Sequence, residues 1–164
     1  MLTHDDEKLM RELLQTFQVE AAEHVQNLNQ TVLVLEREQD SATKAALIQE
    51  AFRSAHSLKG AARAVARPEI EALAHGMEDV LKLARDGELT LDPTVCDVLY
   101  NTLDGIDALL KEQSCDYQGL LARLDSILPH ENGVNPTVAP KALMTGHSHE
   151  SLARDDDSIH RLRS

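Results

Sequence analysis

The sequence predicts an all-α fold, an up-down antiparallel four-helix bundle with a shorter fifth C-terminal helix and a flexible tail. Leu, Ala, Glu and Gln are abundant, Trp is absent, and the 164 residues include only seven Gly and five Pro, which is typical of packed helices with few tight turns. Apolar residues recur every three or four positions, and no stretch shows the alternation of a strand. Because the connections between the helical stretches are short, consecutive helices are expected to be antiparallel neighbours.

The first helix is predicted from about Asp6 to about Glu38, because a single apolar stripe runs along it. The stripe contains Leu9, Leu13, Phe17, Ala21, Val25, Leu28, Val32 and Leu35. Asp40-Ser41 then offers a capping residue for a second helix over roughly Ala42 to Ala64, which carries its own apolar stripe. Four residues on the stripes of the first three helices are interpreted as core: Met10, Phe17, Phe52 and Met77.

Prolines and glycines mark the limits of the third and fourth helices. Pro68 is suited to the first turn of a helix, and Gly87 stops that helix in the left-handed conformation that glycine tolerates. Asp92 and Pro93 form a second pair of cap and first-turn residue. The fourth helix is therefore predicted to run from this pair to Leu110.

A fifth, shorter apolar repeat spans Tyr117 to Leu128 and ends at Pro129. Beyond it the periodicity stops, prolines come close together, and Asp155–Asp157 forms a solvated acidic run. Such a segment buries too little apolar surface to offset the entropy of ordering it. We therefore expect residues 1–128 to form the bundle and residues 129–164 to form a flexible tail or an interdomain linker.

Charge and cysteine usage exclude several classes of protein. The chain has 16 Lys+Arg against 28 Asp+Glu, a formal charge of -12, so neither nucleic acid nor an anionic membrane is an expected partner. No apolar run approaches the roughly 20 residues of a spanning helix, and the first residues are too polar for a signal peptide. A cytoplasmic location is expected. Cys96 and Cys115 are interpreted as reduced thiols on helices.

The second predicted helix carries a group of polar residues around His56. At about 100° per residue, His56 lies roughly 100° from the middle of the apolar stripe, so its imidazole should be reachable from solvent. Lys59 and Gly60 follow it by three and four positions, and Arg63 lies one turn further along the same strip. A glycine inside a helix costs about 1 kcal/mol relative to alanine, which indicates that side-chain bulk is excluded there and that something large docks above His56.

The third helix supplies a carboxylate on its shoulder, Glu78, with His75 further toward solvent. If the two helices are antiparallel neighbours, Glu78 can accept a hydrogen bond from the Nδ1–H of His56 and leave Nε2 as an outward-facing nucleophile. Lys59 and Arg63 would supply positive charge near a phosphoryl group. The sequence has no Gly-rich phosphate loop and no recognisable Mg²⁺ arrangement. The chain should therefore receive and pass on a phosphoryl group, and whether it counts as an enzyme by itself stays open.

Three segments carry a resemblance to a known family. Ala55–Ala62 resembles the signature of histidine phosphotransfer (HPt) domains, and Leu73–Leu81 with Arg85–Leu89 resembles the amino-terminal domain of CheA-type chemotaxis histidine kinases. The similarity extends from about residue 17 to residue 128. It departs from the common pattern in two places: Val65-Ala66-Arg67 stands where the family often has a Phe-Gly pair, and Arg63 stands at a position that is commonly small.

The resemblance implies roles for the residues and for partners. His56 would be the phosphorylated histidine, Glu78 its hydrogen-bond partner, and Lys59 and His75 supporting residues. In such kinases a separate ATP-binding domain, holding ATP and Mg²⁺, phosphorylates the histidine, usually across a dimer. A CheY-like or CheB-like receiver domain, with its own Mg²⁺, then takes the phosphoryl group on an aspartate. The chain itself is expected to need no cofactor and, when isolated, to be monomeric.

A rival interpretation is a helical-bundle metal-binding protein that uses His56, His75 and Glu78 as ligands. It has weaker support, because carboxylate-bridged metal bundles carry a second Glu-x-x-His pair that this sequence lacks. Lys59 and Arg63 beside His56 would also repel a cation. A third interpretation, a docking module, shares the same bundle and differs only in leaving His56 unmodified.

Overall fold

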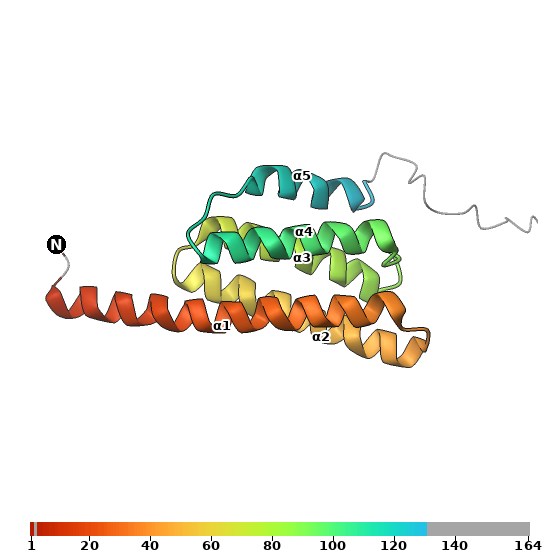
Figure 1. Ribbon diagram of the computed structural model, residues 1–164, viewed down its shortest axis with the longest axis horizontal. Helices are drawn as coiled ribbons and strands as arrows, with labels where there is room; N and C mark the ends of the chain where they lie inside the picture. The colour runs from red at the N-terminus through yellow and green to blue at the C-terminus, as the bar shows by residue number, and fades with distance from the viewer. Residues whose placement is uncertain (2, 131–164) are drawn as a thin grey trace, which may run out of the picture. The chain divides into compact units, whose positions relative to one another are not determined.

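The computed structural model describes residue 1 and residues 3–130, and these residues form helices and their connections, with no strand among them. The helices are α1 (His4–Arg37), α2 (Ser41–Ala64), α3 (Pro68–Arg85), α4 (Pro93–Leu110) and α5 (Tyr117–Ile127) (Figure 1). Each begins and ends within two residues of its prediction. The tail predicted over residues 129–164 lies, from residue 131 onward, outside the described residues.

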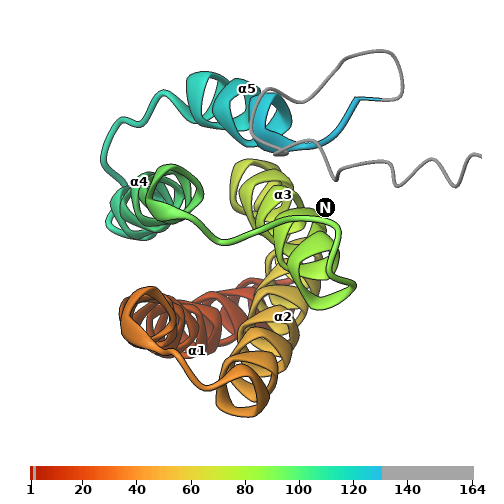
Figure 2. The same ribbon diagram turned by 90° about the vertical axis from the view of Figure 1, so that its right-hand side faces the viewer.

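The first four helices form a ring when viewed end-on (Figure 2). Each contacts its two neighbours, α1 with α2, α2 with α3, α3 with α4 and α4 with α1, while α5 packs outside the ring against α3 and α4. The predicted four-helix bundle with an added fifth helix is confirmed. The α2–α3 pair shares the most extensive contact of any two helices, and it carries the candidate site.

Side-chain caps fix where the helices begin. The Asp40 carboxylate accepts a hydrogen bond from the backbone N–H of Thr43 at 2.8 Å, and Asp92 accepts one from Val95 at 2.9 Å, as an N-cap residue should. The hydroxyl of Thr43 also donates to Asp40, and these two hydrogen bonds lower the pKa of Asp40. Asp40 thereby fixes the first turn of α2, the helix that carries His56.

The tight connection between α2 and α3 consists of residues 65–67, the segment that departs from the family pattern. Ala66 has φ +55°, a left-handed conformation that costs an L-residue about 1–2 kcal/mol more than glycine. The guanidinium of Arg67 donates a 2.8 Å hydrogen bond to the backbone carbonyl of Leu109 near the end of α4, a carbonyl that also accepts one from the backbone N–H of Glu112. Arg67 thereby ties the connection to α4.

The core lies inside the ring and extends under α5. Its largest fully buried side chains come from all five helices: Leu28, Val32, Leu35, Leu58, Ile70, Leu73, Met77, Leu81, Leu99, Leu103, Ile106 and Leu124. The close approach of α5 to α3 depends on Gly76, since a Cβ at that position would lie 2.8 Å from Cδ1 of Leu124. The small residue next to His75 is therefore explained by helix packing.

Two sequence predictions about burial are wrong. Leu9, Met10 and Leu13 are 57%, 48% and 47% exposed, although all three lie on the predicted apolar stripe or its edge. The reason is that α1 extends past the end of the bundle (Figure 1), where no described helix covers it, and Phe17 is the first buried residue of its stripe. Phe52 is only partly buried, and its surroundings are described below.

The two thiols are free, but only one lies on a helix. Cys96 is buried in α4, and burial raises its pKa to about 11. Cys115 lies in the connection between α4 and α5 instead of on a helix, because the loop before the Asp116 cap includes it. Among the described residues, no helix has the length and apolar character required to cross a membrane.

Candidate functional site

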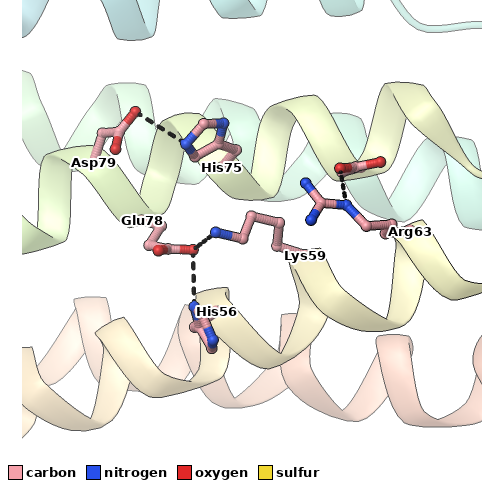
Figure 3. Close-up of polar contacts among 7 residues, drawn as sticks. His56, Lys59, Arg63, His75, Glu78 and Asp79 are labelled. Carbon is pink, nitrogen blue, oxygen red and sulfur yellow. Dashed lines mark hydrogen bonds and ion pairs between the residues drawn. The ribbon is translucent and has the colours of Figure 1, made fainter.

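His56 projects from α2 on the side that faces α3, and its side chain is 63% exposed. Its Nδ1 atom lies 3.3 Å from Oε2 of Glu78 on α3 (Figure 3). The antiparallel pairing of α2 and α3 brings the two residues together, as the shoulder positions of both predicted. A carboxylate accepts hydrogen bonds and cannot donate them, so the ring nitrogen that faces it is the one that carries the proton.

One carboxylate oxygen of Glu78, Oε2, contacts both Lys59 and His56. Its side chain is only 14% exposed, and Oε2 lies 2.7 Å from Nζ of Lys59 as well as 3.3 Å from His56. That oxygen is shielded from solvent and has no well-aligned hydrogen bond from any described residue. Both contacts are therefore held more by the charge of the carboxylate than by hydrogen-bond direction, and contacts of this kind commonly tighten when a reaction begins.

The ionisation of Glu78 reflects two opposing influences. Burial of the carboxyl group raises its pKa, whereas the contacts with Lys59 and with His56 lower it. The two contacts together outweigh burial, so the pKa of Glu78 lies below its ordinary value of 4.5. The carboxylate is thus charged at neutral pH in spite of its burial. A charged acceptor is what holds the Nδ1–H of a neutral imidazole in place.

Lys59 and Gly60 occupy different surroundings from one another. The Lys59 side chain is 17% exposed and its ammonium points at Glu78 (Figure 3), on the Nδ1 side of the imidazole. The structure therefore places Lys59 behind the ring, whereas the sequence suggested a position beside the phosphoryl group. Gly60 has open space around it, and a Cβ at that position would have nothing within 4 Å. The bulk that would exclude a side chain there is absent from the described residues, so the surface beside His56 is free for a partner.

The structure does not bring Arg63 or His75 into this group. Arg63 pairs with Glu71 on α3, with Nε 2.6 Å from Oε1, and its side chain is 71% exposed. Nε2 of His75 lies 3.7 Å from Oδ2 of Asp79 on the same helix. Both side chains of that second pair point away from His56 (Figure 3) and line a shallow groove between α3 and α5.

This separation removes the ligand set of the metal-binding interpretation. His56 and Glu78 meet between α2 and α3, whereas His75 contacts Asp79 and lines the groove between α3 and α5. Within residues 3–130 as described, no three His, Cys, Asp or Glu side chains are grouped so that they could hold a metal ion.

Two residues near His56 are missed by reasoning from the sequence. The ring of Phe52 stacks on that of His56, with centroids 6.3 Å apart and planes at 19°. The guanidinium of Arg85, the last residue of α3, lies over the Phe52 ring, 4.5 Å from its centroid. The spacing of four between Phe52 and His56 was a usable signal, but the apolar stripe of α2 favoured a core role for Phe52.

The arrangement suits nucleophilic chemistry at one nitrogen. Nδ1 faces a charged carboxylate that is largely shielded from solvent, so Nε2 carries the lone pair, and the exposure of the His56 side chain leaves that nitrogen accessible. Neutral imidazole with a free Nε2 can form a covalent bond to an electrophilic phosphorus. The described residues around it supply orientation and charge, as carboxylates behind metal-bound histidines do.

Comparison with known proteins places the chain in a family. A family model described as "Hpt domain" matches residues 12–113. The chain is 39% identical over 124 residues to the chemotaxis protein CheA of Treponema pallidum, covering 72% of this chain and 15% of that protein. It is 36% identical over 110 residues to the gliding motility regulatory protein of Myxococcus xanthus, covering 67% of this chain and 14% of that protein. The chain thus spans about 15% of the length of these relatives.

A solved structure supports the same fold. The phosphorylated P1 domain of CheA3, in complex with CheY6 from R. sphaeroides, aligns with a TM-score of 0.61 and 24% sequence identity, covering 70% of this chain and 94% of that domain. The match confirms the helical bundle. The family model covers well over half of the sequence, and it includes both helices of the site. The chain therefore belongs to the Hpt domain family.

Proposed function

We propose that this chain is a histidine phosphotransfer domain, in which His56 accepts a phosphoryl group from an ATP-dependent kinase domain and passes it to the receiver aspartate of a response regulator. The observation that carries the proposal is the pairing of an exposed imidazole, at Nδ1, with a charged carboxylate that is largely shielded from solvent. Membership of the Hpt family and the likeness to CheA support it.

The proposed transfer keeps one proton in place throughout. The Nε2 lone pair attacks the phosphorus, a P–N bond forms, and the P–O bond to the leaving phosphate of ADP breaks with its electron pair on oxygen. The ring then carries a positive charge, with the proton still on Nδ1, 3.3 Å from Glu78. When a receiver aspartate attacks the phosphorus, the P–N bond breaks and its electrons return to Nε2. Glu78 therefore stabilises the charge that develops on the ring.

Lys59 acts through Glu78 in this scheme. A carboxylate that is shielded from water and has no counter-charge would take up a proton. It would then be a poor acceptor for the hydrogen bond from Nδ1–H. Lys59, 2.7 Å from Oε2, keeps Glu78 ionised and fixes its position, so we assign Lys59 the role of a positioning residue. Arg63 and His75 receive no part in the transfer step, because they contact Glu71 and Asp79.

The partners are proposed from the relatives. A CheA-type kinase domain elsewhere would bind ATP and Mg²⁺, since this chain has no recognisable phosphate loop. A response-regulator partner of the CheY or CheB kind is supported by the similar solved structure, in which a P1 domain is in complex with CheY6. The open surface at Gly60 beside His56 provides the space for such a partner.

The test uses two phosphoryl donors with the full chain. One is ATP with a CheA-type kinase domain, and the other is phosphoramidate, which requires no docking partner. We expect either donor to attach one acid-labile phosphoryl group, detected by intact-mass measurement and lost at low pH. His56→Gln should abolish labelling and His75→Gln should retain it. Labelling that persists in His56→Gln, or a wild-type chain that neither donor labels, would overturn the proposal.

A further inference from the structure

The surroundings of the His56 ring differ on its two sides along α2. Side chains of a helix lean toward its N-terminus, so the ring of His56 lies over the preceding turn and meets the residue four positions earlier, Phe52. Four positions later stands Gly60, which offers no side chain and has open space around it. The ring is thus covered on one side and free on the other.

Phe52 is itself held in place. It is partly buried and packs against the hydrophobic core, which limits the movement of its ring. The planes of Phe52 and His56 are nearly parallel, at 19°, and the 6.3 Å separation of their centroids is within the range of interacting aromatic pairs. An exposed imidazole accordingly rests on a ring that the core anchors.

Arg85 also contacts the ring of Phe52. Glu78 and Arg85 are seven residues apart on α3 and therefore share one face of that helix, so the helix that supplies the carboxylate to His56 also supplies the cation to Phe52. The guanidinium lies 4.5 Å from the Phe52 centroid, a cation–π distance. Its Nε lies 3.1 Å from Oδ1 of Asp86, which accepts a hydrogen bond from it. The ring of Phe52 thus contacts both the reactive ring of His56 and the guanidinium of Arg85.

We propose that Phe52 is a positioning residue for phosphotransfer, with Arg85 holding Phe52 in turn. This inference rests on the proposed function of His56. Glu78 fixes the Nδ1 edge of the ring and Phe52 supports one of its faces, so the ring plane, and with it the direction of the Nε2 lone pair, is set before the donor arrives. Transfer requires that lone pair to be in line with the breaking P–O bond, and the donor has free access from the Gly60 side.

Suitable variants distinguish this role from simple packing. Phe52→Leu keeps apolar bulk but removes the flat face, whereas Phe52→Tyr keeps both. Tyr117 on α5 is a matched control, because it is another partly buried aromatic packed on the core and stacks on no histidine among the described contacts. Tyr117→Leu therefore reports the general cost of removing such a ring.

The experiment measures the rate of His56 labelling by phosphoramidate and the NMR signals of the His56 ring protons, with thermal unfolding followed in parallel. We expect Phe52→Leu to slow labelling roughly two- to tenfold, the rate equivalent of one lost aromatic contact, and to shift the His56 signals. Phe52→Tyr should restore both. Arg85→Gln should shift the same signals in the same direction by less, and it carries the test if Phe52→Leu does not fold.

The outcomes separate this inference from the proposed function. Wild-type labelling at His56 together with an unchanged rate in Phe52→Leu, or an equal slowing in Tyr117→Leu, would overturn the role of Phe52 alone. Unchanged His56 signals in Arg85→Gln would overturn the role of Arg85. Absence of any labelling of His56 in the wild-type chain would instead overturn the phosphotransfer function itself.

Discussion

His56 and His75 are two exposed histidines on adjacent helices, each beside a carboxylate, yet their surroundings differ in every other respect. His56 meets Glu78 on another helix, at Nδ1, and that carboxylate is 14% exposed and also bound by Lys59. His75 meets Asp79 on its own helix, at Nε2, and that carboxylate is 47% exposed, with 3.7 Å between the atoms. The two histidine side chains are alike, and the difference lies in the contacts that hold the carboxylate beside each of them.

The comparison shows why one of the two histidines is suited to chemistry. An exposed pair four residues apart on one helix contributes about 0.3–0.5 kcal/mol and leaves both side chains free to move. A carboxylate shielded from water and tied to a lysine is already oriented, so no rearrangement is needed when the ring becomes charged. The opposite nitrogen is also engaged at His75, which leaves Nδ1, the more hindered nitrogen, as its free position.

Removing each acid in turn should separate the two histidines most clearly. We expect Glu78→Gln to slow labelling of His56 by about 10- to 100-fold, as loss of a carboxylate behind a reactive histidine commonly does. Asp79→Asn is the matched control and should leave the rate within about twofold of wild type. Phosphoramidate labelling, followed by intact mass, measures both. Equal rates for Glu78→Gln and wild type would contradict the role of Glu78.

Replacing the lysine tests whether Glu78 depends on a counter-charge. Lys59→Met keeps the length of the side chain but leaves a buried carboxylate without its nearest cation, so we expect a loss of about 1–3 kcal/mol in the free energy of unfolding and about tenfold slower labelling. Arg63→Met is the control, because its pair with Glu71 is largely exposed and should cost no more than about 1 kcal/mol. Urea denaturation gives both values, and similar losses would show that burial of Glu78 is irrelevant.

The ionisation of Glu78 predicts a pH dependence of stability. Its folded-state pKa lies below 4.5, so the charged carboxylate stabilises the fold above that pH, and the contribution is lost as the pH falls through the folded-state pKa. Asp6 and Asp40 also have lowered pKa values. Their contributions to the pH dependence are the same in two proteins that differ only at residue 78, so they cancel in the comparison. We expect the wild-type chain to be more stable than Glu78→Gln near neutral pH, by an amount that shrinks below about pH 4.5. A difference that stays constant down to pH ~3 would contradict this expectation.

Much of the fold could be predicted because its signals are local. The caps at Asp40 and Asp92 and the stop at Gly87 depend on nearby backbone groups, and the apolar stripes give each helix a buried face. A stripe does not reveal whether a neighbour covers it. For that reason Leu9 and Leu13 continue the pattern of Phe17 but lie exposed beyond the end of the bundle.

The site was predictable in its positions but not in its contacts. The helix faces on which His56 and Glu78 lie predict that the two residues meet across an antiparallel pair of helices. Which way a long side chain turns depends on competing partners in three dimensions. Lys59 turns to Glu78, and Arg63 to Glu71, and neither choice is written in the sequence of one helix. The same holds for Arg85, which reaches Phe52 from a different helix.

The central claim is that the proton of His56 sits on Nδ1 against Glu78 and the lone pair on Nε2. The most direct test is to phosphorylate the full chain and identify the modified nitrogen by phosphorus and nitrogen NMR. We predict a single phosphoryl group on Nε2 of His56. A phosphoryl group on Nδ1 of His56, or on His75, would contradict the claim.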